Sequence, residues 1–492
     1  MSEGWLVGRE EQPTTSRRSR LIPVSILNGH LRIPLLLLAL AEIFTVFAAV
    51  YTAVLVRFLG LSSVSAAITL FHTTVGSIWP RALLVSGVTL VCLAAMGLYR
   101  LQHRAEFSGI VLRILAAVLL AEAVLGLIFY VVPSLFVGRG IIGLQGVFSC
   151  VALTVVRYGF LRLVDGNVFR RRVLVWGSGA RAASVTNKLR RRTDQRGFNL
   201  IGFVEAPGDG HDVPGHRLLR PDEHLLSLAL RHNIDEIVIA PDDRRQGFPI
   251  ADLLECRVRG IEVSDVMEFI ERESGRVDLA LMQPSWLIFS KGFRSDGLRL
   301  ASKRAFDVFV SASALLLSAP IALLTAIAII LEDRGPVLYR QTRVGQNGKL
   351  FRMLKFRSMR VDAEPDGDAR WAARDDPRTT RVGKLIRKLR IDELPQVVNV
   401  LVGHMSFVGP RPERPEFVES LNKAIPYYRE RHTVKPGITG WAQVKFSYGS
   451  SQSDARQKLE YDLFYVKNHS LALDLMVLVH TVEVVVFGIG SR

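Results

Sequence analysis

Residues Val308–Leu331 read VFVSASALLLSAPIALLTAIAIIL, an apolar run of 24 residues with Pro320 near its middle. An α-helix needs about 20 apolar residues to cross the hydrocarbon core of a bilayer. Lys303 and Arg304 precede the run, and positions 340–390 behind it hold 15 Lys or Arg against six Asp or Glu. The run therefore predicts a membrane-embedded helix in front of a strongly basic, water-exposed domain.

The charge around this run favours a helix that enters and leaves the membrane on the same side. Positive residues accumulate on the cytoplasmic side of membrane proteins, so a spanning helix would place the basic domain outside, against that bias. Pro320 removes one helix hydrogen bond and clashes with the preceding turn, and a helix broken there can turn back. The alternative is a kinked helix that still spans, which membranes tolerate. We predict a re-entrant helix over 308–331.

Four further apolar runs near spanning length lie upstream. They are Ile33–Val56, Ala82–Tyr99, Ile114–Val132 and Ile141–Leu161. Arginines cluster before the first run, between the second and third, and after the fourth. The positive-inside rule then predicts a four-helix transmembrane unit over 33–163, with both ends and the tail 1–32 in the cytoplasm. Glu42 and Glu122 within the runs are either functional intramembrane carboxylates or carboxyl groups that are paired or protonated inside the bundle.

The middle of the chain, residues 170–290, alternates short apolar strands with helical segments. Strands are predicted at Val173–Trp176, Leu200–Val204, Glu236–Ala240 and Ile261–Val266, and one of the helices at Glu223–Arg231. This alternation is typical of a parallel, doubly wound Rossmann-like sheet. The first strand runs into Gly177-Ser178-Gly179-Ala180-Arg181-Ala182, which fits a G-x-G-x-x-A turn. Such a turn either seats a phosphate on the next helix or only reverses the chain tightly.

The third part, residues 298–492, contains a pair of adjacent carboxylates, Asp392 and Glu393, behind a cationic helix-like stretch. The cations of that stretch are Lys384, Arg387, Lys388 and Arg390. A carboxylate acts as a nucleophile on phosphorus when a divalent metal and nearby cations offset the repulsion of the phosphate charge. The neighbouring carboxylate suits Mg²⁺, which prefers oxygen ligands. The final segment, Leu471–Gly488, is apolar but carries three polar residues, which favours an interfacial helix.

The sequence blocks around this pair are long and occur in a definite order. They are Phe351–Met359 (FRMLKFRSM), Arg390–Pro395 (RIDELP), Met405–Pro412 (MSFVGPRP), Lys435–Val444 (KPGITGWAQV) and Tyr461–Asn468 (YDLFYVKN). Together they closely resemble the bacterial sugar transferase family, the monotopic polyprenyl-phosphate phosphoglycosyl transferases. The resemblance covers essentially residues 302–492, and the three-part architecture is similar to the large exopolysaccharide-initiating members. Because these motifs lie beyond Ser302, a fragment starting near Leu298 is expected to keep some activity.

The resemblance implies a reaction in two steps. Asp392 would attack the sugar-bearing phosphate of a UDP-sugar, expel UMP and hold a covalent phospho-sugar, which undecaprenyl phosphate then accepts. Glu393 matches the dyad partner that helps to hold Mg²⁺, so both carboxylates are the expected metal ligands. Lys355, Arg387 and Arg411 match the cations that the family places near phosphate.

Pro320 matches the proline that breaks the re-entrant helix of the family, but two positions depart from the family pattern. Ala319 stands where serine usually precedes that proline, and His404 stands where the family usually has aspartate before Met-Ser. The resemblance further implies membrane lipid as a partner, the bacterial inner membrane as the location and a cytoplasmic catalytic domain. A homodimer is also an expectation. Glucose and galactose phosphates are the leading candidate groups, and no residue discriminates between them.

Two other function classes agree less well with the sequence. Membrane-bound nucleotide-sugar dehydratases also have a Rossmann domain, but they need a Tyr-x-x-x-Lys base, and residues 170–290 contain no tyrosine. A net charge of +17 is compatible with nucleic-acid binding. However, the excess charge is spread over juxtamembrane loops and the phosphate-handling part, without a recognisable nucleic-acid motif. We therefore expect no nucleic-acid partner.

Overall fold

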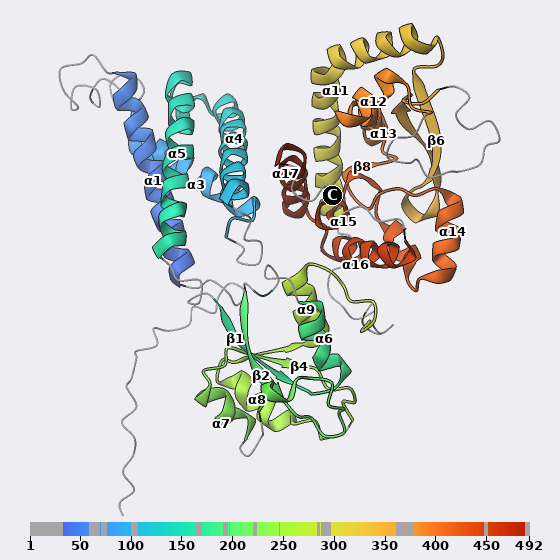
Figure 1. Ribbon diagram of the computed structural model, residues 1–492. Helices are drawn as coiled ribbons and strands as arrows, with labels where there is room; N and C mark the ends of the chain where they lie inside the picture. The colour runs from blue at the N-terminus through green and yellow to red at the C-terminus, as the bar shows by residue number, and fades with distance from the viewer. Residues whose placement is uncertain are drawn as a thin grey trace, which may run out of the picture.

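The computed structural model describes residues 33–58, 69, 76–99, 107–163, 170–189, 195, 197–219, 224–245, 247–282, 286, 297–360, 378–446 and 451–487. The predicted tail, residues 1–32, lies outside them. A group of apolar helices comes first, an α/β unit follows, and a third part starts with a long helix (Figure 1). This is the order of elements expected from the sequence.

The first part consists of long apolar helices that pack against one another (Figure 1). They are α1 (Ile33–Arg57), α3 (Ile78–Ala95), α4 (Phe107–Val131) and α5 (Arg139–Leu163). Each contains a stretch long and apolar enough to cross a membrane. Helices α3 and α4 begin ahead of the predicted Ala82 and Ile114, because the predicted runs start after Arg81 and Arg113 and both helices include these arginines.

Glu42 is completely buried in this helical unit and is paired. Arg157 donates to its carboxylate from Nε at 2.6 Å and from Nη2 at 3.1 Å, and the Tyr99 hydroxyl donates to it as well. Buried charges persist when they are paired and hydrogen-bonded. Of the two alternatives for Glu42, the structure therefore supports the paired carboxylate. In contrast, Oε2 of Glu122 is buried without a hydrogen-bond partner among the described residues.

The middle part contains a five-stranded parallel sheet in the order β3-β2-β1-β4-β5. Its strands are β1 (Arg171–Trp176), β2 (Phe198–Val204), β3 (Leu218–Leu219), β4 (Glu236–Ile239) and β5 (Glu262–Asp265). Its helices are α6 (Ala180–Lys188), α7 (Leu225–Arg231), α8 (Ile250–Val258) and α9 (Val266–Ser274). The four predicted strands and the predicted helix are present, and the two-residue β3 was not predicted.

Alternate residues of the central strands face two separate cores. Val173 and Val175 of β1 pack with α6 and α9, whereas Leu174 and Trp176 pack with α7 and α8. Helices thus cover both faces of a parallel sheet, as a doubly wound fold requires. The prediction of a parallel, Rossmann-like sheet is confirmed.

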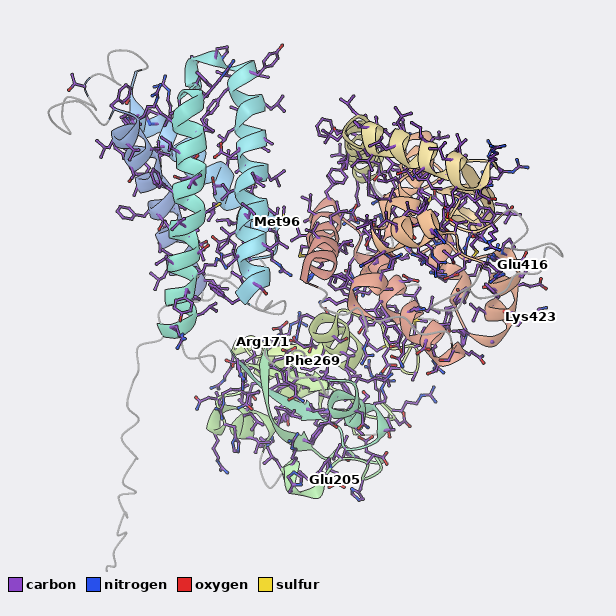
Figure 2. The ribbon with its side chains drawn as sticks, turned by 45° about the horizontal axis from the view of Figure 1, so that its top comes forward. Met96, Arg171, Glu205, Phe269, Glu416 and Lys423 are labelled. Carbon is purple, nitrogen blue, oxygen red and sulfur yellow. The ribbon has the colours of Figure 1, made fainter. Side chains whose placement is uncertain are left out.

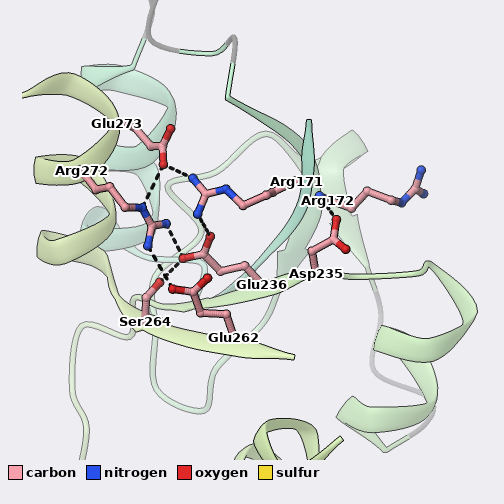
Figure 3. A network of polar contacts seen from close by, with 8 residues as sticks. All are labelled: Arg171, Arg172, Asp235, Glu236, Glu262, Ser264, Arg272 and Glu273. Atoms are coloured by element: carbon pink, nitrogen blue, oxygen red, sulfur yellow. Dashed lines mark hydrogen bonds and ion pairs between the residues drawn. The ribbon is translucent and has the colours of Figure 1, made fainter. Parts of the chain in front are cut away.

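A network of buried charges lies where β1 and β4 begin (Figure 3). Arg171 donates to Glu273 and, at 2.7 Å, to Glu236. Arg272 of α9 donates to the same two carboxylates, at 2.5 Å to Glu236 and at 3.1 Å to Glu273. The Ser264 hydroxyl donates to Glu236 at 2.6 Å. Because removing one member would leave a buried charge without its partner, the network holds α9 firmly against the sheet.

The third part begins with α11 (Gly297–Asp333), a helix of 37 residues that contains Pro320 and bends sharply partway along its length (Figure 1). Proline inside a helix is the commonest cause of such a bend. The other elements are β6 (Leu338–Val344), β7 (Leu350–Phe356), α12 (Arg381–Lys388), η5 (Ile391–Glu393), α13 (Gln396–Val402), β8 (Ser406–Val408), α14 (Pro415–Ala424), η6 (Tyr428–Thr433), β9 (Gly437–Thr439), α15 (Trp441–Lys445), α16 (Gln452–Asn468) and α17 (Leu471–Phe487).

Both ends of α11 are bonded to neighbouring helices of this third part. Near its start, Arg304 donates to the carbonyl oxygen of Val400 in α13 at 2.8 Å. At its far end, the Glu332 carboxylate accepts hydrogen bonds from the N–H groups of Arg381 at 2.7 Å and Val382 at 3.0 Å. These two N–H groups belong to the first turn of α12, so Glu332 caps the N-terminus of the helix that precedes Asp392 and Glu393.

Helix α17 lies between the helical unit and the rest of the third part (Figure 1). His480 is hydrogen-bonded to Arg113 of α4 at 2.7 Å. Met476 packs against Gly97, beside the Met96 labelled in Figure 2, where an added Cβ would meet its sulfur at 2.6 Å. The last helix of the chain therefore joins the third part to the first.

Candidate active site

Asp392 and Glu393 lie on η5, a single turn between α12 and α13. Arg390, just before this turn, has a φ of 59°, a left-handed conformation that costs a non-glycine residue about 1–2 kcal/mol. Backbone strain of this kind is concentrated at functional sites. Asp392 is buried, with 9% of its surface exposed, and the Glu393 side chain is 16% exposed.

Three cations surround the Glu393 carboxylate. Its Oε1 lies 3.4 Å from Nζ of Lys355, 3.5 Å from Nη2 of Arg411 and 3.8 Å from Nη1 of Arg390. Lys355 belongs to β7 and Arg411 to the Pro-Arg-Pro turn after β8, and Arg390 directly precedes η5. The fold therefore brings the dyad together with two of the cations expected from the sequence.

The third expected cation, Arg387, is half-buried on α12. Its Nη1 lies 3.3 Å from the Thr379 hydroxyl, and its charge lowers the pKa of Asp392, against the effect of burial. Pro320, the remaining residue singled out in the sequence, lies within α11, where a proline removes one helix hydrogen bond and favours a bend.

The two carboxyl groups of the dyad are shifted in opposite directions. Burial and the neighbouring charge of Glu393 raise the pKa of Asp392 above its ordinary value, and Lys355, Arg390 and Arg387 oppose this shift. Burial would also raise the pKa of Glu393, but Arg411, Lys355 and Arg390 outweigh it and lower that pKa. Paired carboxyl groups with divergent pKa values are typical of sites in which the two have different roles.

Asn399, which the sequence analysis did not single out, fixes β7 against the helix that follows the dyad. This buried side chain accepts a hydrogen bond from the Leu354 N–H at 2.9 Å and donates one to the Arg352 carbonyl oxygen at 2.8 Å. Its amide thereby pairs with β7 as a neighbouring strand would. Because Asn399 is in α13 and Lys355 is in β7, the two bonds hold Lys355 beside Glu393.

Arg343 is a further cation that the sequence analysis missed. Its Nη1 lies 3.7 Å from Glu413 and 3.2 Å from the Pro412 carbonyl oxygen. Burial lowers its pKa to about 10, and Arg411 and Arg414 add to the effect. Side chains alternate between the faces of a strand, and β6 pairs Tyr339 with Lys355. Tyr339, Gln341 and Arg343 of β6 therefore point to the same face of the sheet as Lys355. The alternation of side chains along a strand could have predicted this position of Arg343 from the sequence.

His404, one of the two departures from the family pattern, is exposed. Its ring centroid lies 6.0 Å from that of Phe351, and its N–H group donates to the Asn399 carbonyl oxygen at 3.0 Å. The residue therefore contributes to the turn after α13 through its backbone. Ala319 of the other departure is exposed on α11, next to Pro320.

The dyad is suited to Mg²⁺ only together with a substrate. Among the described residues, no group of three or more His, Cys, Asp or Glu lies close enough to hold a metal alone. Mg²⁺ at phosphoryl-transfer sites is usually held by one or two carboxylates, with phosphate oxygens and waters completing its shell. Asp392 and Glu393 are adjacent, partly accessible oxygen donors, so they fit this arrangement.

Two known protein families match parts of this chain. The bacterial sugar transferase profile matches residues 298–488, from α11 to α17, and the profile of a CoA-binding domain matches residues 94–242. A UDP-N-acetylgalactosamine-undecaprenyl-phosphate N-acetylgalactosaminephosphotransferase of Aeromonas hydrophila is 42% identical over 240 residues, which are 49% of this chain and 56% of the relative. An undecaprenyl-phosphate glucose phosphotransferase of Komagataeibacter xylinus is 36% identical over 325 residues, 65% of this chain and 59% of the relative.

A third relative is covered more completely. The UDP-glucose:undecaprenyl-phosphate glucose-1-phosphate transferase of Klebsiella pneumoniae is 34% identical over 330 residues, 66% of this chain and 69% of the relative. The chain thus spans less than two-thirds of the first two relatives and slightly more than two-thirds of the third. By the profile match, these identities and the motifs assembled around Asp392, this chain belongs to the bacterial sugar transferase family.

Proposed function

We propose that this chain is a membrane-bound phosphoglycosyl transferase that moves a hexose-1-phosphate from a UDP-sugar to undecaprenyl phosphate, releasing UMP and initiating an exopolysaccharide. One observation carries the proposal: a buried Asp392 stands beside a Glu393 that three cations keep ionised. The relatives are named for different sugars, so the proposal does not extend to one hexose.

Asp392 is the proposed nucleophile. A carboxylate oxygen of Asp392 attacks the phosphorus that carries the sugar, the bond from this phosphorus to the UMP oxygen breaks, and UMP leaves. An oxygen of undecaprenyl phosphate then attacks the same phosphorus. The bond to Asp392 breaks, and the polyprenyl diphosphate sugar leaves with the carboxylate regenerated.

The cations around the dyad have two roles in this proposal. Lys355, Arg411 and Arg390 offset the repulsion between the carboxylates and an incoming phosphate, and they stabilise the charge on the transferring phosphoryl group. They also keep Glu393 ionised, as a metal ligand must be. Asp392 and Glu393 would hold Mg²⁺, which supplies further charge neutralisation at the phosphate oxygens when bound.

The position of α11 supports a catalytic part that stays on one side of the membrane. A straight helix over 308–331 would be about 36 Å long, enough to cross the bilayer. Yet Arg304 before this stretch and Glu332 behind it are both bonded to helices of the same third part. We therefore propose that α11 enters the membrane, bends at Pro320 and returns to the side it came from. On the cytoplasmic side, the site would meet UDP-sugars where they are made.

The test is UMP release by the full-length chain in nanodiscs containing undecaprenyl phosphate, with a panel of UDP-sugars. Asp392→Asn should lower the rate at least a hundredfold, because the amide cannot attack phosphorus. Glu393→Gln should also impair turnover through weaker metal binding. Glu419→Gln, an exposed carboxylate on α14, is the matched control and should keep the wild-type rate. Release at the wild-type rate by Asp392→Asn would refute the assignment of the nucleophile.

A further inference from the structure

The turn between β1 and α6 is the place where a Rossmann fold usually binds a nucleotide. The pyrophosphate there rests on the free N–H groups at the N-terminus of the helix after the first strand. The match to the CoA-binding profile ends at residue 242 and includes this turn, so the fold family implies such a ligand. A nucleotide could bind there only if the residues around this turn left space for its pyrophosphate.

Asp242 occupies the N-terminus of α6. This residue follows β4, and its carboxylate accepts hydrogen bonds from the N–H groups of Ala180 at 3.0 Å and Arg181 at 2.9 Å. A Cβ added to Gly179 would meet Oδ2 of Asp242 at 1.9 Å. The carboxylate therefore fills the space over Gly179 through which a phosphate would approach the helix.

Asp209 closes the rest of the turn. This residue lies after β2, and one oxygen of its carboxylate accepts from the N–H groups of Ser178 at 2.9 Å and Gly179 at 3.4 Å. The other oxygen accepts from the N–H group of Asp242 at 2.8 Å. The N–H groups from Ser178 to Arg181 are thus all bonded to carboxylates of the chain itself.

The first glycine of the motif has a separate structural role. Gly177 has a φ of 135°, and a Cβ there would lie 2.4 Å from the Ala240 carbonyl oxygen. This glycine lets the turn pass directly over the end of β4. Of the two alternatives open from the sequence, the tight turn accounts for every contact at this site.

We infer that the middle part does not bind a nucleotide pyrophosphate at this turn, because Asp242 and Asp209 are built-in occupants of the phosphate position. Two carboxylates accept the hydrogen bonds that an anionic ligand would need, and their charge repels it. The middle part instead packs against the third part through α9, where the Glu271 carboxylate accepts a hydrogen bond from Nζ of Lys467 at 2.6 Å.

The test uses the full-length chain in nanodiscs, with CoA and NAD⁺ as probes in titration calorimetry. Neither should bind the wild-type chain, and any binding at another place should not weaken in Asp242→Ala. Saturable binding to the wild type that weakens at least tenfold in Asp242→Ala would overturn the inference. If Asp242→Ala does not fold, Asp242→Asn, which keeps the shape and removes the charge, replaces it.

A second measurement asks whether the carboxylate stands where an anion would sit. Asp242→Ala exposes two N–H groups, so its unfolding temperature should fall below that of the wild type and rise again with added sulfate. Asp243→Ala, which removes the same charge one residue away, should show no such recovery, because the Asp243 side chain accepts a hydrogen bond from the Arg245 N–H within its own loop. A lowered unfolding temperature that sulfate does not restore in Asp242→Ala would contradict the inferred position.

Discussion

The indole Nε1 of Trp441 donates a hydrogen bond to the carbonyl oxygen of Gly275, 2.7 Å away. Gly275 ends α9 in a left-handed conformation with φ 67°, and an added Cβ would meet the indole ring at 3.0 Å. Two residues later, the Val277 N–H donates to the Glu460 carbonyl oxygen at 3.0 Å. The end of the middle part is therefore packed into the third part rather than tethered beside it.

This packing bears on the fragment that begins near Leu298. Val277, Leu279 and Met282 are buried in one cluster with residues of α14 and α16, and such a fragment lacks them. Each buried side chain of this size contributes roughly 1.5–3 kcal/mol, so the loss should be on the order of 5 kcal/mol. We expect the shorter fragment to unfold at a lower temperature, and to release UMP more slowly, than one that starts at Arg170.

The comparison requires both fragments in the same nanodiscs. Thermal unfolding and UMP release would be measured side by side, with the full-length chain as the reference. Equal unfolding temperatures for the two fragments would show that the Val277–Met282 segment contributes nothing to the stability of the third part.

The pKa shift of Asp392 predicts the acidic side of the pH–rate profile. Ionised Asp392 is the reactive form, so activity rises with pH through its pKa. Burial and Glu393 raise this pKa, so the rise in kcat/KM should lie at a higher pH than an ordinary aspartate, with its pKa of about 3.9, would give. Lys355 lowers the pKa of Asp392, so Lys355→Met should move the rise to still higher pH.

Lys355→Arg is the matched control for the pH experiment, because it keeps the positive charge in β7. Its acidic limb should stay close to that of the wild type. An acidic limb in Lys355→Met at or below the wild-type position would contradict the electrostatic account of the site.

Replacing Pro320 should alter the path of α11. In Pro320→Leu the helix regains a hydrogen bond and should straighten, so that Arg304 and Glu332 cannot both keep their partners. Cysteines placed at Leu300 and Arg340, in a chain without its native cysteines, report the side of the membrane by labelling with an impermeant reagent. Both should be cytoplasmic in the parent chain, and position 340 should become periplasmic in Pro320→Leu, with loss of UMP release.

Ala319→Leu adds bulk beside the proline without removing it and should label as the parent does. Periplasmic labelling of position 340 in the parent chain itself would eliminate the re-entrant arrangement.

Asn399→Ala should separate Lys355 from Glu393 without touching either. It removes two buried hydrogen bonds and leaves their backbone partners unsatisfied, at a cost of about 1–3 kcal/mol per group. We expect a lower unfolding temperature and a kcat reduced at least tenfold. Asn399→Asp keeps the acceptor for the Leu354 N–H and should lie between the wild type and Asn399→Ala. Asn422→Ala, an exposed position on α14, is the control. A kcat unchanged in Asn399→Ala despite a lower unfolding temperature would limit Asn399 to a structural role.

The features of this molecule that could be predicted are those encoded by residues close together in the sequence. The four predicted strands of the middle part were found because each is a short apolar run bounded by turn residues, a pattern that lies within a few residues of sequence. The apolar helices were found because a membrane requires a minimum length of hydrophobic chain. The Asp392–Glu393 pair was found because its neighbours form contiguous blocks. Two-residue β3 and the true start of α4 were not found, since neither leaves a local pattern.

The amino-acid sequence by itself determined the order of the three parts, the parallel sheet, the apolar helices and the residues of the dyad. Only the tertiary structure decided which groups meet: Arg157 with Glu42, three cations with Glu393, Asp242 with the turn after β1, and both ends of α11 with one domain. The reason is physical. Periodicity records which face of an element is buried, whereas a partner far along the chain is selected by packing and by the cost of leaving a buried charge or N–H group unpaired.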